Sequence, residues 1–105
     1  MDSKQQFRWG LLLIDCMKQL RAEGLHIVDQ EVIPSFDGEP NGLVAWFICE
    51  HTNAAEDFDL HAMTEALRSK MQDAGFPQSA VETLRTSVTS QSEIQAGGGR
   101  FFFFR

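Results

Sequence analysis

The sequence predicts an α+β fold: a two-layer sandwich, ferredoxin-like in general architecture, in which a four-stranded and mostly antiparallel sheet carries two helices on one face. Two amphipathic segments predict the helices. Segments rich in β-branched and aromatic residues follow each helix and predict strands, in the order αββαββ. Because 105 residues suffice to bury a core without disulfides or a structural metal, we expect a single domain over 1–105.

The helices are predicted over about residues 5–23 and 60–74, where apolar residues recur at intervals of three and four. These apolar residues are Phe7, Leu11, Ile14, Met17 and Leu20 in the first helix, and Leu60, Met63, Leu67, Met71 and Ala74 in the second. Gly24 and Gly75 follow the helices, in the position where a left-handed residue commonly ends a helix. Both helix ends are therefore predicted from the sequence.

Acidic residues surround the start of the second predicted helix, at Glu56, Asp57 and Asp59. Asn53, Asp57 or Asp59 is its candidate N-cap. The positive end of a helix dipole favours carboxylates at this position, so we interpret the acidic group as structural rather than functional.

Four segments predict strands: 25–33, 43–49, 81–89 and 101–104. Residues 43–49 and 101–104 are apolar on both faces, which is typical of central strands. Residues 25–33 and 81–89 carry charged and polar side chains in mid-strand, which favours edges. Numbered along the chain, the predicted strand order is therefore 1-2-4-3. The pattern also predicts a pseudo-repeat of two α-β-β units, over about 5–51 and 52–105.

Four consecutive phenylalanines form the last predicted strand. Phe101 and Phe103 would lie on one face of the sheet and Phe102 and Phe104 on the other, because side chains alternate along a strand. Two helices can cover only one of these faces. The other face would be left bare, and an exposed apolar patch of this kind marks an interface or a ligand groove.

We therefore expect a homodimer through the outer sheet face, since two-fold dimers are the commonest soluble assemblies. The outer face would contain two of the terminal phenylalanines together with either Trp46 or Phe47. The alternative is a monomer in which the segments 34–42 and 89–99 fold over that face.

The net charge of −6 and the isoelectric point of about 4.9 disfavour nucleic acid and acidic surfaces as partners, because phosphate binding needs concentrated positive charge. A basic protein partner remains open. No membrane partner is expected, because no apolar run is long enough to span a bilayer.

Localisation is predicted from the cysteines and the first apolar run. Cys16 and Cys49 lie in apolar segments without a disulfide spacing, as expected of reduced, buried thiols. The apolar run 9–14 stops at Asp15, and no small-residue cleavage site follows. These features predict a cytoplasmic protein.

Residues with potential chemistry are few. Cys49 and His51 would share a face of one strand, with His61 across a loop, which suits a zinc ion or a thiolate-imidazole pair. The sequence offers no further ligand motif, so no catalytic residue, metal site or cofactor is predicted. The glycines at 97–99 precede a predicted strand rather than a helix, which favours a hairpin or loop over a phosphate site. Arg100 could hold an anionic ligand or keep the apolar strand soluble.

These observations favour a small, non-catalytic, cytosolic regulatory or protein-interaction module acting as a homodimer. One alternative is a sensor of small molecules with an aromatic pocket, and a second is an enzyme that uses Cys49 and His51. No motif indicates a particular family. The candidate ligand or interface residues are Trp46, Phe47, His51, Arg100, Phe101, Phe102, Phe103 and Phe104.

Overall fold

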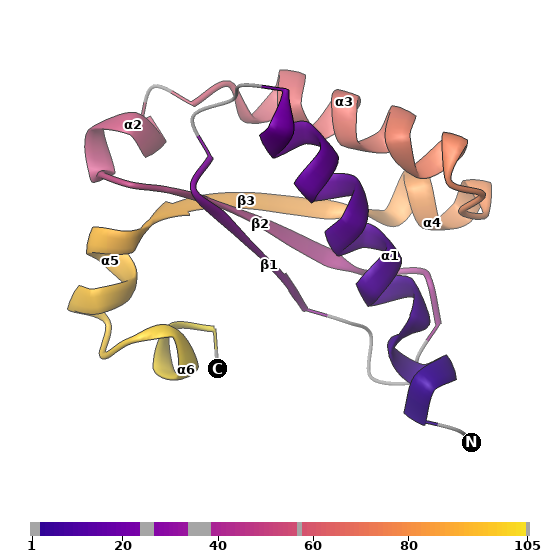
Figure 1. Ribbon diagram of the computed structural model, residues 1–105, viewed down its shortest axis with the longest axis horizontal. Helices are drawn as coiled ribbons and strands as arrows, with labels where there is room; N and C mark the ends of the chain where they lie inside the picture. Colours follow the sequence, from indigo (N-terminus) through magenta and orange to yellow (C-terminus); the bar gives the residue numbers. More distant parts are fainter. Residues whose placement is uncertain (1–2, 24–26, 34–38, 57, 105) are drawn as a thin grey trace.

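The chain folds around a mixed three-stranded sheet of order β1-β2-β3, as far as the residues with defined positions show (Figure 1). The computed structural model describes residues 3–23, 27–33, 39–56 and 58–104. The elements in chain order are α1 (Ser3–Ala22), β1 (Asp29–Ile33), β2 (Val44–Cys49), α2 (Thr52–Glu56), α3 (Leu60–Asp73), α4 (Gln78–Thr83), β3 (Arg85–Ser90), α5 (Gln91–Ala96) and α6 (Arg100–Phe103).

The central strand β2 pairs antiparallel with β1 and parallel with β3. Glu31 lies opposite Trp46 in the first pair, and Ser87 lies opposite Trp46 in the second. A parallel partner requires a long crossover, which α2, α3 and α4 provide between β2 and β3. The sequence predicted 43–49 as a central strand, and the structure confirms this for β2. The predicted order 1-2-4-3 is wrong, because β3 pairs directly with β2.

The predicted four-stranded sheet is wrong, and with it the αββαββ order and the mostly antiparallel pairing. Residues 100–103 form the short helix α6 instead of a strand, and residues 91–96 form α5. The second α-β-β unit therefore contains one strand only. A short apolar run has no periodicity that separates strand from helix, which is why the run of phenylalanines was misassigned.

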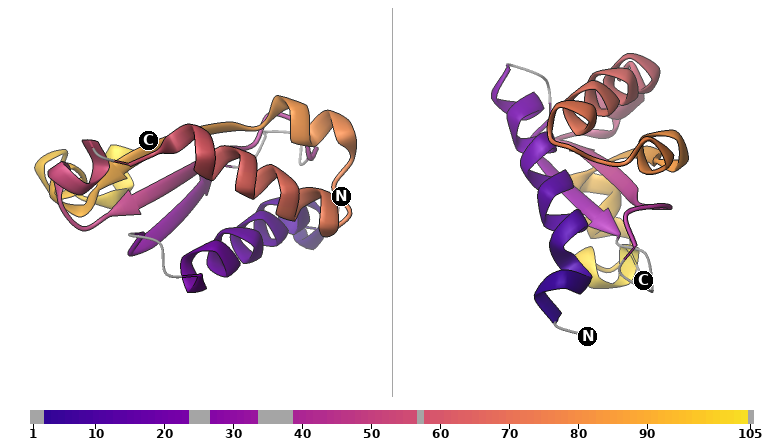
Figure 2. Two further views of the ribbon diagram at one scale, coloured as in Figure 1. Left: turned by 90° about the horizontal axis from the view of Figure 1, so that it is seen from above. Right: turned by 90° about the vertical axis from the view of Figure 1, so that its right-hand side faces the viewer.

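Both long helices pack on one face of the sheet, which we call the inner face and define by Ala45, Phe47 and Cys49 of β2 (Figure 2). The apolar side of α1, including Leu13 and Met17, packs there with Leu67 and Met71 of α3. Lys70 of α3 also pairs with Glu23, next to the end of α1, at 2.9 Å. The predicted positions of the two helices are thus confirmed.

The ends of α3 follow the local signals. Asp59 is the N-cap, and its carboxylate accepts a hydrogen bond from the Ala62 amide at 3.0 Å. At the other end, Gly75 adopts φ +92°, and the amide of Phe76 donates back to the Met71 carbonyl. Of the other predicted caps and stops, Asp57 and Gly24 lie outside the described residues.

Within the described parts of the chain, no helix combines the length and the apolar character needed to cross a bilayer.

Candidate functional site

The opposite face of the sheet, which we call the outer face, presents Val44, Trp46 and Ile48 of β2. The short helices α5 and α6 lie below this face, on the side of the sheet opposite α1 and α3 (Figure 1). Ile94 of α5 is buried, which places an apolar side chain of the C-terminal segment inside the fold. The chain itself therefore covers part of the face that the sequence predicts to be bare.

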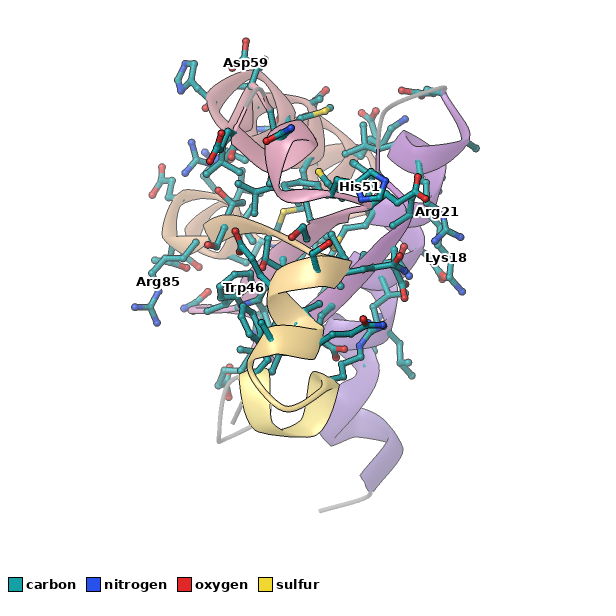
Figure 3. All side chains as sticks on the ribbon, turned by 90° about the vertical axis from the view of Figure 1, so that its left-hand side faces the viewer. Lys18, Arg21, Trp46, His51, Asp59 and Arg85 are labelled. Atoms are coloured by element: carbon teal, nitrogen blue, oxygen red, sulfur yellow. The ribbon has the colours of Figure 1, made fainter. Side chains whose placement is uncertain are left out.

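Ser90 is the N-cap of α5, directly after β3. The Ser90 hydroxyl accepts a hydrogen bond from the Glu93 amide at 3.1 Å, which satisfies a free amide at the helix start. The Glu93 carboxylate accepts a second bond, from the Thr89 hydroxyl at 2.7 Å. After α5 the chain reverses at Gly98 and Gly99, both with positive φ, which brings α6 back beneath the sheet (Figure 3).

Trp46 packs edge-on against two rings of the terminal run. Its ring centroid lies 5.6 Å from that of Phe103 and 5.2 Å from that of Phe104. Such edge-to-face pairs contribute about 0.5–1.5 kcal/mol beyond the area they bury. All three side chains are half-buried. Phe101 and Phe102 lie in α6, but the structure describes only their backbone.

Arg100 joins α6 to the edge strand β1 through three hydrogen bonds. Its guanidinium donates to the Glu31 carboxylate at 2.7 Å, the Asp29 carboxylate at 2.6 Å and the Gln30 carbonyl at 2.6 Å. Burial alone would raise the pKa of Asp29, but the hydrogen bonds from Arg100 and the Gln30 amide, with nearby positive charge, lower it overall. The Arg100 guanidinium, which we expected to hold an anionic ligand or to keep the predicted strand soluble, is therefore bound to the carboxylates of β1.

The candidate pocket residues do not converge on one site. Phe47 is fully buried on the inner face, with its ring 5.4 Å from that of Phe58, whereas Trp46 lies on the outer face. His51 lies beyond the end of β2 with 73% of its side chain exposed. The proposed aromatic pocket would need these three side chains on one side of the sheet, and the structure places them apart.

Cys49 and His51 differ in their exposure to solvent. The Cys49 thiol is buried, and burial raises its pKa, which is the opposite of what an activated nucleophile needs. The exposed His51 imidazole lies 3.8 Å from the Glu50 carboxylate. Among the described residues, no three His, Cys, Asp or Glu side chains are grouped closely enough to bind a metal ion.

Two hollows of the surface are polar and open. One, of about 360 Å³, lies between α3 and α4 and is lined mainly by Glu65, Arg68, Gln72, Gln78 and Glu82. The other, of about 230 Å³, lies between β1 and α5. Neither includes an aromatic side chain, so neither provides the apolar lining expected of a pocket for a small organic ligand.

The outer edge of β3 presents backbone groups without hydrogen-bond partners. The Arg85 amide donates to the Leu43 carbonyl at 3.1 Å, so the backbone groups of Arg85 point towards β2. Neighbouring residues of a strand point their backbone groups in opposite directions, so those of Thr86 and Val88 point away from the sheet. Within the described residues, the only hydrogen bond made by Thr86 or Val88 joins the Thr86 and Thr64 hydroxyls, 2.7 Å apart, and their outward backbone groups make none.

The sequence analysis missed Thr86 and Val88 as functional candidates, although it predicted 81–89 as an edge strand. The available signal was the alternation in the segment Arg85–Ser90, which has few charges for an edge. Natural edges usually carry charges or proline that prevent pairing, and here Arg85 is the only charged residue of the strand.

No protein-family model matches the chain, and comparisons with curated proteins and with solved structures find no match either.

Proposed function

We propose that the protein is a non-catalytic protein-interaction module that binds by pairing the exposed edge of β3 with a strand of another polypeptide. In this mode of recognition the main-chain hydrogen bonds supply affinity, and the alternating side chains supply specificity. The observation that carries the proposal is the pair of residues Thr86 and Val88, whose amides and carbonyls face outward without partners in the described part of the chain.

The strength of each new contact supports a reversible interaction. A backbone hydrogen bond contributes about 0.5–1.5 kcal/mol net. The two N–H and two C=O groups of Thr86 and Val88 allow four such bonds with one added strand. Their side chains are β-branched, a type that packs well against a neighbouring strand.

The placement of Cys49 and His51 supports the non-catalytic part of the proposal. The Cys49 thiol is buried and its pKa is raised, whereas the His51 imidazole is exposed to solvent.

The test uses the isotope-labelled full chain, at the lowest concentration that amide spectra allow, titrated with a capped peptide of residues 84–90. We expect the amide signals of Thr86 and Val88 to shift and their hydrogen exchange to slow. The matched control is the same peptide N-methylated at its Thr86 and Val88 positions, which removes the donors and should not bind. If the chain is monomeric at this concentration, a titration that moves signals elsewhere on the protein, or none, would overturn the proposal.

A further inference from the structure

We infer that the strand that occupies the β3 edge belongs to a second copy of this chain, in antiparallel register about a two-fold axis through Ser87. This inference rests on the proposed function and specifies the partner. It joins two three-stranded sheets into one continuous sheet, with the two β3 strands at its centre.

The positions of the outward backbone groups define the register. Centring the pair on Ser87 places Thr86 of each copy opposite Val88 of the other. In an antiparallel pair two such residues exchange both N–H···O=C bonds. Thr86 and Val88 of both copies then satisfy one another, so every outward group at these positions finds a partner.

Charge complementarity favours the same register. Arg85 is exposed, points outward on the β3 side of the molecule, and makes no ion pair with any described side chain (Figure 3). The register places Arg85 opposite the partner's Thr89, whose hydroxyl holds the carboxylate of Glu93 at 2.7 Å. Directly opposed residues have Cβ atoms about 4.5–5.5 Å apart. The guanidinium of each copy therefore reaches the Glu93 carboxylate of the other, and the symmetry forms this ion pair twice.

Ser87, the residue on the two-fold axis, does not prevent the two β3 strands from pairing. Ser87 faces its own copy in this register, and its side chain is small and uncharged. On the outer face, Ser87 lies opposite Ser87 and Arg85 lies opposite Thr89 of the other copy, so no like charges meet directly across the axis. Shifting the two strands by two residues would remove Arg85 from Thr89 and leave part of the outward backbone without partners.

This arrangement differs from the face-to-face dimer predicted from the sequence. That dimer required an outer face left bare by its own chain, whereas α5 and α6 occupy part of it. Pairing through the edge does not use the outer face, so α5 and α6 can keep their contacts with it. The edge lies on the side of the sheet away from α1 and β1 (Figure 2).

Sedimentation equilibrium of the full chain with reversed charges tests the inference. Arg85→Glu and Glu93→Arg each replace two attractive contacts by two repulsive ones, and each should weaken the dimer about tenfold. The double variant restores the pairs with opposite polarity and should recover most of the affinity. Higher ionic strength should weaken the native dimer, because the pairs are exposed.

Two controls separate this effect from a general change of charge or of folding. Lys18→Glu and Asp15→Arg make the same changes on exposed positions of α1, on the other side of the molecule, and should leave the dimer unchanged. Arg85→Glu alters a side chain without a described partner, so its thermal unfolding should match that of the native chain even if Glu93→Arg, which also loses the Thr89 bond, is less stable.

Cysteine cross-linking tests the register independently. Ser87→Cys places two thiols opposite each other at the axis, in a non-hydrogen-bonded pair whose Cα atoms are about 4.5 Å apart, a separation that a disulfide can span. Oxidised glutathione should convert this variant to a covalent dimer. Arg85→Cys, displaced from the axis by two residues, should cross-link far more slowly. The native Cys16 and Cys49 are buried and should not interfere.

The outcomes distinguish this inference from the function on which it rests. A chain that stays monomeric at every accessible concentration, yet binds the 84–90 peptide at Thr86 and Val88, overturns the second copy as the occupant and preserves binding at the edge. A dimer that is insensitive to all three charge variants overturns the register. Failure of the peptide to bind at a concentration where sedimentation shows the chain to be monomeric removes both proposals.

Discussion

The two edge strands of this sheet differ in what lies beside their backbone. Two arginine side chains already bind the backbone along β1. Arg100 donates to the Gln30 carbonyl, and Arg21 donates, at 3.2 Å, to the carbonyl of Val28, just before the strand. On β3 the outward groups of Thr86 and Val88 have no such partner among the described residues. Proteins commonly prevent edge pairing with charged side chains. Here the arginine side chains cover one edge and leave the other open to the strand pairing that we propose.

Proline substitutions on β3 compare the side of the strand that faces β2 with its free edge, and they should give the largest effect. The Ser87 amide points towards β2, so Ser87→Pro removes a bond within the sheet and should lower the free energy of unfolding by about 2–3 kcal/mol. Thr86→Pro removes an outward amide and the hydroxyl bond to Thr64, and should cost about 1 kcal/mol. Urea denaturation followed by circular dichroism measures both, and equal losses would contradict the assigned directions of the backbone groups.

Removing the arginine that protects β1 should have the next largest effect. Arg100→Ala eliminates three hydrogen bonds to β1. Because the charged groups are a third or more exposed, we expect a loss of about 1–2 kcal/mol. The uncovered edge should also allow species larger than a dimer in sedimentation velocity. Lys18→Ala, an exposed residue of α1, is the control. Unchanged stability and an unchanged size distribution would show that Arg100 does not protect this edge.

The pH dependence of stability should reveal the same interaction with a smaller effect. The pKa of Asp29 is lowered in the folded chain, so its contribution is fully present above the ordinary carboxyl pKa of about 4 and is lost as the pH falls through the lowered value. Asp29→Asn should therefore be destabilising at neutral pH, and the difference from the native chain should shrink in acid. Unfolding free energies at several pH values measure this, and a constant difference would rule out the ion pair as its source.

Much of the inner layer was predictable because its signals are periodic and long. The spacing from Ile14 to Leu20 and from Leu60 to Met71 predicted the two long helices, and apolar residues on both faces of 43–49 predicted the central strand. Asp59 was among the predicted caps. In each case local preference and tertiary packing favour the same structure.

The C-terminal segment was not predictable in the same way, because its signals are short. Four phenylalanines suit a buried strand as well as a helical turn, and contact with Trp46 decides between them. One signal was available: Ser90 and Glu93 have the spacing of a capping box and indicate a helix start. The role of Arg100 required knowing that α6 returns to β1, a contact between residues about 70 positions apart in the chain.

The two tryptophans lie on opposite sides of the sheet, in different surroundings. Trp9 of α1 packs on Phe76 with ring centroids 5.0 Å apart, whereas Trp46 packs on the terminal rings. Their fluorescence thus provides two built-in optical probes. The fluorescence of the Trp9→Phe variant would report only the detachment of α5 and α6. That of the Trp46→Phe variant would report only the unfolding of the layer formed by α1 and α3. Comparing the two emission curves would show whether the protein unfolds in one step or whether α5 and α6 detach first.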